Sequence, residues 1–121
     1  MSVTSAGLVR LCEPQDWSRA QAVGRIDPDE GEGFVHLSTL DQVHLPANRL
    51  YRGRRDLVLL HVDASLLDAP LRWELGVPTD PESMLFPHLY GPLPVRAVTK
   101  ATAYLPGGDG SFAPAQAHDS T

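Results

Sequence analysis

The stretch Asp56-Leu57-Val58-Leu59-Leu60-His61-Val62-Asp63 decides the fold of this chain. Its apolar residues are nearly continuous over the length of one strand, and such a run is typical of a strand that is covered on both faces. We therefore expect residues 56–63 to form the central strand of a sheet.

Outward from this strand, the sequence predicts two helical segments and several shorter strands. The first helix, residues 14–23, begins at Pro14 and ends before Gly24. The second covers residues 40–52; Ser38 or Thr39 can cap it, and Pro46 should break or restart it. The other expected strands are residues 8–12, 33–38, 71–74, 89–94 and 95–105, and the expected surface loops are 25–33 and 76–87.

The order of these elements indicates the fold class. Strands gather toward the C-terminal half, and no β-α-β repeat is sustained, so we expect an α+β fold with a curved, mainly antiparallel sheet and two N-terminal helical segments. The length of 121 residues suits one domain, which we place at residues 8–105. Residues 1–7 and 106–121 are small, polar or glycine-rich, and we expect both segments to be disordered.

Composition excludes several classes of protein. The contents of 42% hydrophobic and 21% charged residues are typical of a globular domain, and the net charge of −5 argues against a nucleic-acid partner. Cys12 is the only cysteine, which excludes an intrachain disulfide. The sequence has no run long enough to span a membrane and no signal-peptide pattern, so it predicts a cytoplasmic protein without a membrane partner.

Alternation along the strand before the second helix separates two sets of side chains. Val35 and Leu37 are expected to face the core, while Phe34, His36 and Ser38 share the opposite face. A histidine and a serine on one face can both hydrogen-bond a sugar hydroxyl or a phosphate oxygen, so this face is a candidate wall of a cleft. The alternative is a buried histidine that is satisfied by a backbone carbonyl.

His88 and Tyr90 form a second candidate pair. They share one face of an extended segment, and Pro87 on one side and Gly91-Pro92 on the other restrict the backbone. A tyrosine at this place can stack on a planar ring or donate its hydroxyl proton. The alternative is a tyrosine that packs against the edge of the sheet.

The remaining polar candidates carry weaker patterns. Arg72 and Glu74 share the face opposite Trp73, which is also the pattern of a surface ion pair. Phosphate-binding loops, zinc-protease motifs and serine-hydrolase elbows are absent from the sequence. The histidines have no short ligand spacing, so we expect no metal site.

Three segments together resemble the small bacterial family named domain of unknown function 952. These segments are GFVHLST at residues 33–39, DLVLL at 56–60, and LRWE at 71–74 with FPHLYGPL at 86–93. Trp17 and the pair Asn48-Arg49 also fit the pattern of the family. The resemblance extends over residues 8–105.

The resemblance implies a fold similar to ADP-ribosyltransferases and tRNA 2′-phosphotransferases, whose split, curved sheet grips NAD or an ADP-ribosyl unit. It implies an NAD-like nucleotide as substrate, with no cofactor required. The strand that carries His36 resembles the histidine-containing strand of the phosphotransferases, which implies that His36 touches phosphate or ribose and that Tyr90 stacks on a nicotinamide-like ring. We therefore expect His36, His88 and Tyr90 to be the catalytic residues. The implied substrate contacts are Phe34, Ser38, Thr39, Arg49, Arg72 and Glu74.

Two departures from the similar enzymes leave several functions open. The first strand offers Arg10 where those enzymes present a histidine, and no residue after Tyr90 matches their late-strand Glu or Gln. The first hypothesis is a transferase or glycohydrolase that breaks a bond at C1′ of ribose. The second is a non-catalytic protein that binds a nucleotide-like metabolite, and the third is a structural or interaction module. The sequence carries no signature of an oligomer.

Overall fold

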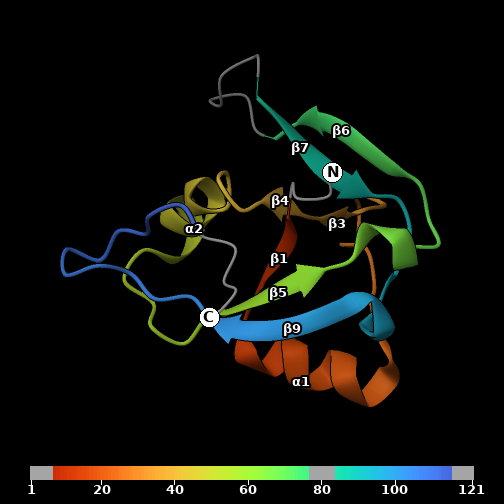
Figure 1. The fold of residues 1–121 in the computed structure, drawn as a ribbon, viewed down its shortest axis with the longest axis horizontal. Coiled ribbons are helices and arrows are strands. Elements are labelled where there is room, and N and C mark those ends of the chain that lie inside the picture. The colour runs from red at the N-terminus through yellow and green to blue at the C-terminus, as the bar shows by residue number, and fades with distance from the viewer. Residues whose placement is uncertain (1–6, 77–83, 116–121) are drawn as a thin grey trace.

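Two antiparallel sheets dominate the fold of this computed structural model, which describes residues 7–76 and 84–115. Figure 1 shows β6 and β7 of one sheet above β1, β5 and β9 of the other, with β3 and β4 between them. The fold is α+β with mainly antiparallel strands, as the sequence predicts. No helix among the described residues is long and apolar enough to cross a membrane.

The four-stranded sheet has the order β4-β1-β5-β9. Its strands are β1 (Leu8–Cys12), β4 (Ser38–Thr39), β5 (Val58–Val62) and β9 (Val98–Ala103). Leu59 and Leu60 point to opposite faces of β5, and both are buried. The expectation of a central strand that is covered on both faces is therefore confirmed.

The three-stranded sheet brings the candidate residues together. It has the order β3-β7-β6, with β3 at Val35–His36, β6 at Leu71–Leu75 and β7 at Leu85–Leu89. In this register His88 of β7 lies opposite His36 of β3 on one side and opposite Arg72 of β6 on the other. The sheet thus places His88 between the two other strands that carry polar candidates.

The expectation of a loop over residues 76–87 is wrong for the last residues of that range, which form a strand. β7 begins at Leu85 and includes Pro87, although proline is unusual in the middle strand of a sheet. Proline has no N–H to donate, but the strand tolerates it because the hydrogen bond at this position uses its carbonyl. The carbonyl of Pro87 accepts from the Leu37 amide at 3.0 Å. Residues 77–83 of the expected loop lie outside the described residues.

The first helix agrees with the sequence, and the second differs from it. α1 covers Pro14–Val23, and Gly24 ends it with a φ of 94°. α2 covers His44–Tyr51, so it begins later than expected and continues through Pro46. Pro46 lies in the first turn, where a missing N–H breaks no helical hydrogen bond. Thr39 precedes a hydrogen-bonded turn instead of capping the helix, since its carbonyl accepts from the amides of Gln42 and Val43.

Two short elements lie in segments that the sequence assigned differently: a strand in the first expected loop, and a helical turn at the start of the last expected strand. β2 (Arg25–Ile26) pairs with β8 (Leu93–Pro94), so the expected loop over residues 25–33 begins with a strand. The last expected strand starts with a helical turn, Val95–Ala97, and only then becomes β9. Both pieces depend on partners that are far away in the sequence.

The segment after β9 is packed as far as Ala115, which corrects the expectation of disorder for residues 106–115. Phe112 is 3% exposed and lies against Tyr104, with ring centroids 4.9 Å apart. The side-chain amide of Asn48 in α2 accepts from the Phe112 amide at 2.7 Å and donates to its carbonyl at 3.0 Å. The folded unit therefore extends to Ala115, and residues 1–6 and 116–121 lie outside the described residues.

Tyr104 offers a test of this packing. Its hydroxyl donates to the carbonyl of Ala113 at 2.6 Å, and burial raises the pKa of Tyr104 to about 12. Folding therefore favours the neutral phenol of Tyr104. The resulting contribution to the stability of the folded state is complete below pH 10, the ordinary pKa of tyrosine, and is lost as the pH rises through about 12. We expect an alkaline titration followed by tyrosinate absorbance to show a step near pH 12 that Tyr104→Phe removes. A Tyr104 step near pH 10 would contradict the packing.

Candidate functional site

His88 lies at the centre of the candidate site. It is 3% exposed, and its Nδ1 is 2.8 Å from Oε1 of Glu74 on the neighbouring strand β6. Phe34 stacks on the imidazole with ring centroids 4.1 Å apart and an interplanar angle of 13°. The other ring nitrogen, Nε2, is buried and has no hydrogen-bond partner, which is unusual for a polar atom inside a protein.

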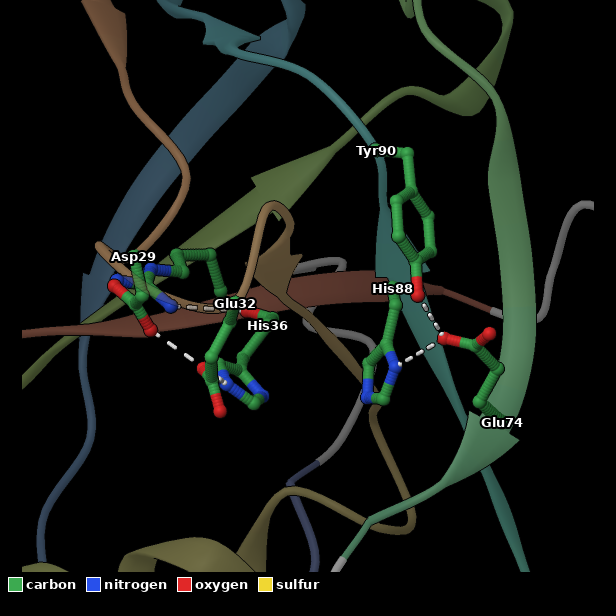
Figure 2. Close-up of polar contacts among 7 residues, drawn as sticks. Asp29, Glu32, His36, Glu74, His88 and Tyr90 are labelled. Carbon is green, nitrogen blue, oxygen red and sulfur yellow. Dashed lines mark hydrogen bonds and ion pairs between the residues drawn. The ribbon is translucent and has the colours of Figure 1, made fainter.

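Glu74 fixes the protonation of this imidazole. Its Oε1 also accepts a hydrogen bond from the Tyr90 hydroxyl at 2.6 Å, and the hydrogen bonds from Tyr90 and then His88 lower the pKa of Glu74 below its ordinary value. An ionised carboxylate can only accept, so Nδ1 of His88 carries the proton and donates it to Glu74. The other ring nitrogen, Nε2, points away from Glu74 (Figure 2), and in the neutral imidazole it carries the lone pair.

Tyr90 is held from two sides. Its hydroxyl is bonded to Glu74, and the guanidinium of Arg72 lies over its ring, 5.0 Å from the centroid. The hydrogen bond to Glu74 also raises the pKa of Tyr90, because it stabilises the neutral phenol. Arg72, Glu74 and Tyr90 thus form a support behind His88.

His36 faces His88 from β3 but has different partners. Its Nε2 lies 2.5 Å from Oε1 of Glu32 and 3.6 Å from Oδ2 of Asp29, and its side chain is 43% exposed. The two imidazole rings are nearly perpendicular, with centroids 5.3 Å apart. Figure 2 shows the result: each histidine is bound to carboxylate on its outer side, and the two rings face each other.

A cavity of about 420 Å³ opens beside these histidines, a volume within the usual range for small-molecule sites. Its walls come from both sheets, from both helices and from the loop that carries Asp29. The polar residues that line it are Arg10, Asp16, Asp29, His36, Ser38, Arg49 and His88, and most of the others are apolar or aromatic, including Leu11, Pro46, Leu50, Tyr51 and Phe86.

The residues expected from the sequence divide into two groups. Those that line the cavity are His36, Ser38, Arg49 and His88. The described lining does not include Phe34, Thr39, Arg72, Glu74 or Tyr90. Phe34 contacts both histidine rings, and Thr39 donates its hydroxyl to Asp41 at 2.6 Å. Arg72 and Glu74 both contact Tyr90, and the charge of Arg72 also helps to lower the pKa of Glu74.

Three polar residues of the site were missed by the sequence analysis. Arg10 lines the cavity, donates to the His36 carbonyl at 3.0 Å and buries an Nε that has no partner. An arginine in an otherwise apolar strand was the available signal. Asp29 and Glu32 were assigned to a surface loop, and the spacing D-x-x-E-x-x-x-H toward His36 could have indicated their role.

Together, these features define a small two-sheet α+β protein with a histidine-lined cavity. The chain belongs to the family described as "Protein of unknown function (DUF952)", which it matches over residues 11–101, so the expected family is confirmed. The chain is similar to the crystal structure of protein CC0527 from Caulobacter crescentus, at 33% identity and a TM-score of 0.74, covering 88% of this chain and 92% of that one. The solution NMR structure of CC0527 gives a TM-score of 0.71 at 33% identity, covering 88% and 91%. No curated protein matches the chain.

Proposed function

We propose that the cavity binds a ribosyl nucleotide of the NAD type and that the chain is an enzyme that transfers or hydrolyses the bond at C1′ of its ribose. One observation carries this proposal: Nε2 of His88 is buried, has no partner and belongs to a side chain that lines a cavity of nucleotide-binding size. In many general bases, one ring nitrogen of a histidine donates its proton to a carboxylate, and the other nitrogen is left free to accept a proton. His88 has this arrangement, with Nδ1 bonded to Glu74 and Nε2 free.

The chemistry of the cavity wall fits the parts of such a ligand. Arg10 and Arg49 can contact phosphate oxygens, and the buried, unpartnered Nε–H of Arg10 requires an acceptor. Leu50, Tyr51 and Phe86 supply apolar contact for a base. The two mainly antiparallel sheets also support the ADP-ribosyltransferase-like fold that the sequence resemblance implies.

Hydrolysis in this cavity would proceed as follows. A water oxygen attacks C1′ of the ribose, the C1′–N bond breaks, and the base leaves with the bonding electron pair. Nε2 of His88 accepts the proton of the water, and Glu74 stabilises the imidazolium through Nδ1–H. His36 and Ser38, on the same cavity wall, would hold the ribose hydroxyls or a phosphate.

One observation favours the second hypothesis, a non-catalytic nucleotide-binding protein. Enzymes that cleave this bond commonly place a carboxylate beside the ribose to stabilise its developing positive charge. Oxygen Oε1 of Glu74 already accepts from His88 and Tyr90, and Glu74 is not part of the described lining. The carboxylates that do line the cavity, Asp16 and Asp29, come from α1 and from the loop before β3, and neither comes from a late strand. The two hypotheses share the ligand and differ in whether it is consumed.

A binding screen tests the ligand, and a product assay then separates the two hypotheses. We expect NAD, NADP, ADP-ribose or nicotinamide mononucleotide to raise the melting temperature and to shift the NMR signals of His36 and His88, with glutathione as the unrelated control. Ligand at 100 times its Kd would add about 2.7 kcal/mol to the free energy of unfolding. Release of the free base from the bound nucleotide would support the enzyme, and binding without release would support the binding protein. If no nucleotide binds at millimolar concentration, the proposal is wrong.

A further inference from the structure

We propose that Asp29, Glu32 and His36 bind a divalent transition-metal ion at the edge of the cavity. One ligand atom from each of these three residues lies within 4.8 Å of the other two, which is close enough for a single ion to contact all three. Two carboxylates and one imidazole are a donor set that suits Zn²⁺, Mn²⁺ or Fe²⁺. This site departs from the expectation of no metal, which considered spacing among histidines only.

The backbone already holds these three side chains in place. The carbonyl of Asp29 accepts from the amides of Glu32 and Gly33, and its amide donates to the Phe34 carbonyl, so the loop closes on the start of β3. The carbonyl of His36 is bonded to Arg10, and its ring packs edge-on against Phe34 with centroids 4.8 Å apart. An ion would therefore bind with little ordering of the protein.

His88 provides an independent indication of a bound group. It is 3% exposed, and its unpartnered Nε2 lies on the side of the ring that faces His36 in Figure 2. Asp29, His36 and His88 all line the same cavity, so an ion at the cluster would lie in the space that this nitrogen borders. A water bound to the ion could donate a hydrogen bond to Nε2 and so satisfy the buried lone pair.

The local charge also favours a cation. Asp29 and Glu32 bring two carboxylates to one imidazole. A dication coordinated by all three groups would balance both negative charges. The inference goes beyond the nucleotide proposal and is tested without any nucleotide.

The test compares two variants of the full chain by calorimetric titration with Zn²⁺ alone. Glu32→Gln removes one proposed ligand, and we expect it to weaken binding by about tenfold or more. Glu30→Gln removes the same charge two residues away, outside the cluster, and should leave the affinity unchanged. Glu32 has a side chain that is 47% exposed, so its variant should fold, which the melting temperature without metal checks. No binding to the wild type, or equal weakening in both variants, would overturn the proposal.

Mn²⁺ then locates the ion, because this paramagnetic ion broadens NMR signals of nearby nuclei. We expect the amide signals of residues 29–36 and the ring signals of His88 to broaden first. In Glu32→Gln the same manganese concentration should leave residues 29–36 sharp. Broadening that begins elsewhere in the chain would overturn the site.

Discussion

If the chain hydrolyses the nucleotide as proposed, replacing His88 by glutamine is expected to slow release of the base by about 10²–10⁴-fold, the usual contribution of a general base. Glutamine keeps a polar group near Glu74 but offers no basic nitrogen to the cavity. The rate should be measured under saturating nucleotide, so that weaker binding is not mistaken for slower chemistry. A variant that retains the wild-type rate would show that His88 does not accept the proton.

His44 supplies a matched control for this substitution. Like His88, it buries a ring nitrogen that has no partner, its Nδ1, but it is not part of the described lining of the cavity. His44→Gln should therefore leave the rate of base release unchanged. If both variants slow the reaction equally, the effect comes from the fold and not from the chemistry of His88, and their melting temperatures should then fall together.

Replacing Phe112 by alanine is expected to lower the free energy of unfolding by about 3–5 kcal/mol, because it removes a buried ring and leaves a cavity. The ring packs in one core cluster with Val9, Ala47 and Leu59, which belong to β1, α2 and β5. Loss of this contact should therefore weaken the whole domain. Equilibrium denaturation in urea measures the change.

Leu105→Ala is the control for Phe112→Ala. Leu105 belongs to the same segment after β9 but is 51% exposed, so its truncation should change the free energy of unfolding by no more than about 0.5 kcal/mol. Equal small losses in the two variants would mean that residues 106–115 contribute little to stability, and the expectation of a disordered tail would regain support.

The elements that local signals specify could be predicted from the sequence. The continuous apolar run from Leu57 to Leu60 indicated a central strand, and Pro14 and Gly24 marked both ends of α1. These signals act through neighbouring residues: proline fits the first turn of a helix, and glycine adopts the left-handed backbone after its last turn.

The elements that depend on distant partners could not be predicted. β2 and β8 are two residues long and form only because they pair with each other. Pro87 was assigned to the end of a loop. Nothing near it in the sequence shows that its partner, the Leu37 amide, needs only the carbonyl of Pro87. Phe112 follows a glycine-rich stretch, and its anchor, Asn48, lies in α2.

The sequence predicted which residues belong to the candidate site better than it predicted what each of them does. Alternation correctly placed His88 and Tyr90 on one face, since both bond to the same oxygen of Glu74. Stacking of Tyr90 on a ligand stays a prediction, and the described lining of the cavity does not include this residue. Arg10 was noted only as a departure from the similar enzymes, because its place in the site depends on His36, a residue of the other sheet.

The position of β5 between β1 and β9 has a consequence for folding during synthesis on the ribosome. The central strand is synthesised well before its partner at Val98–Ala103, and closing such long loops slows folding. Until β9 leaves the exit tunnel, one edge of an apolar strand stays open to pairing with other chains. Nascent chains that stop short of residue 98 are therefore expected to aggregate, and chaperones that cover exposed strands should bind them.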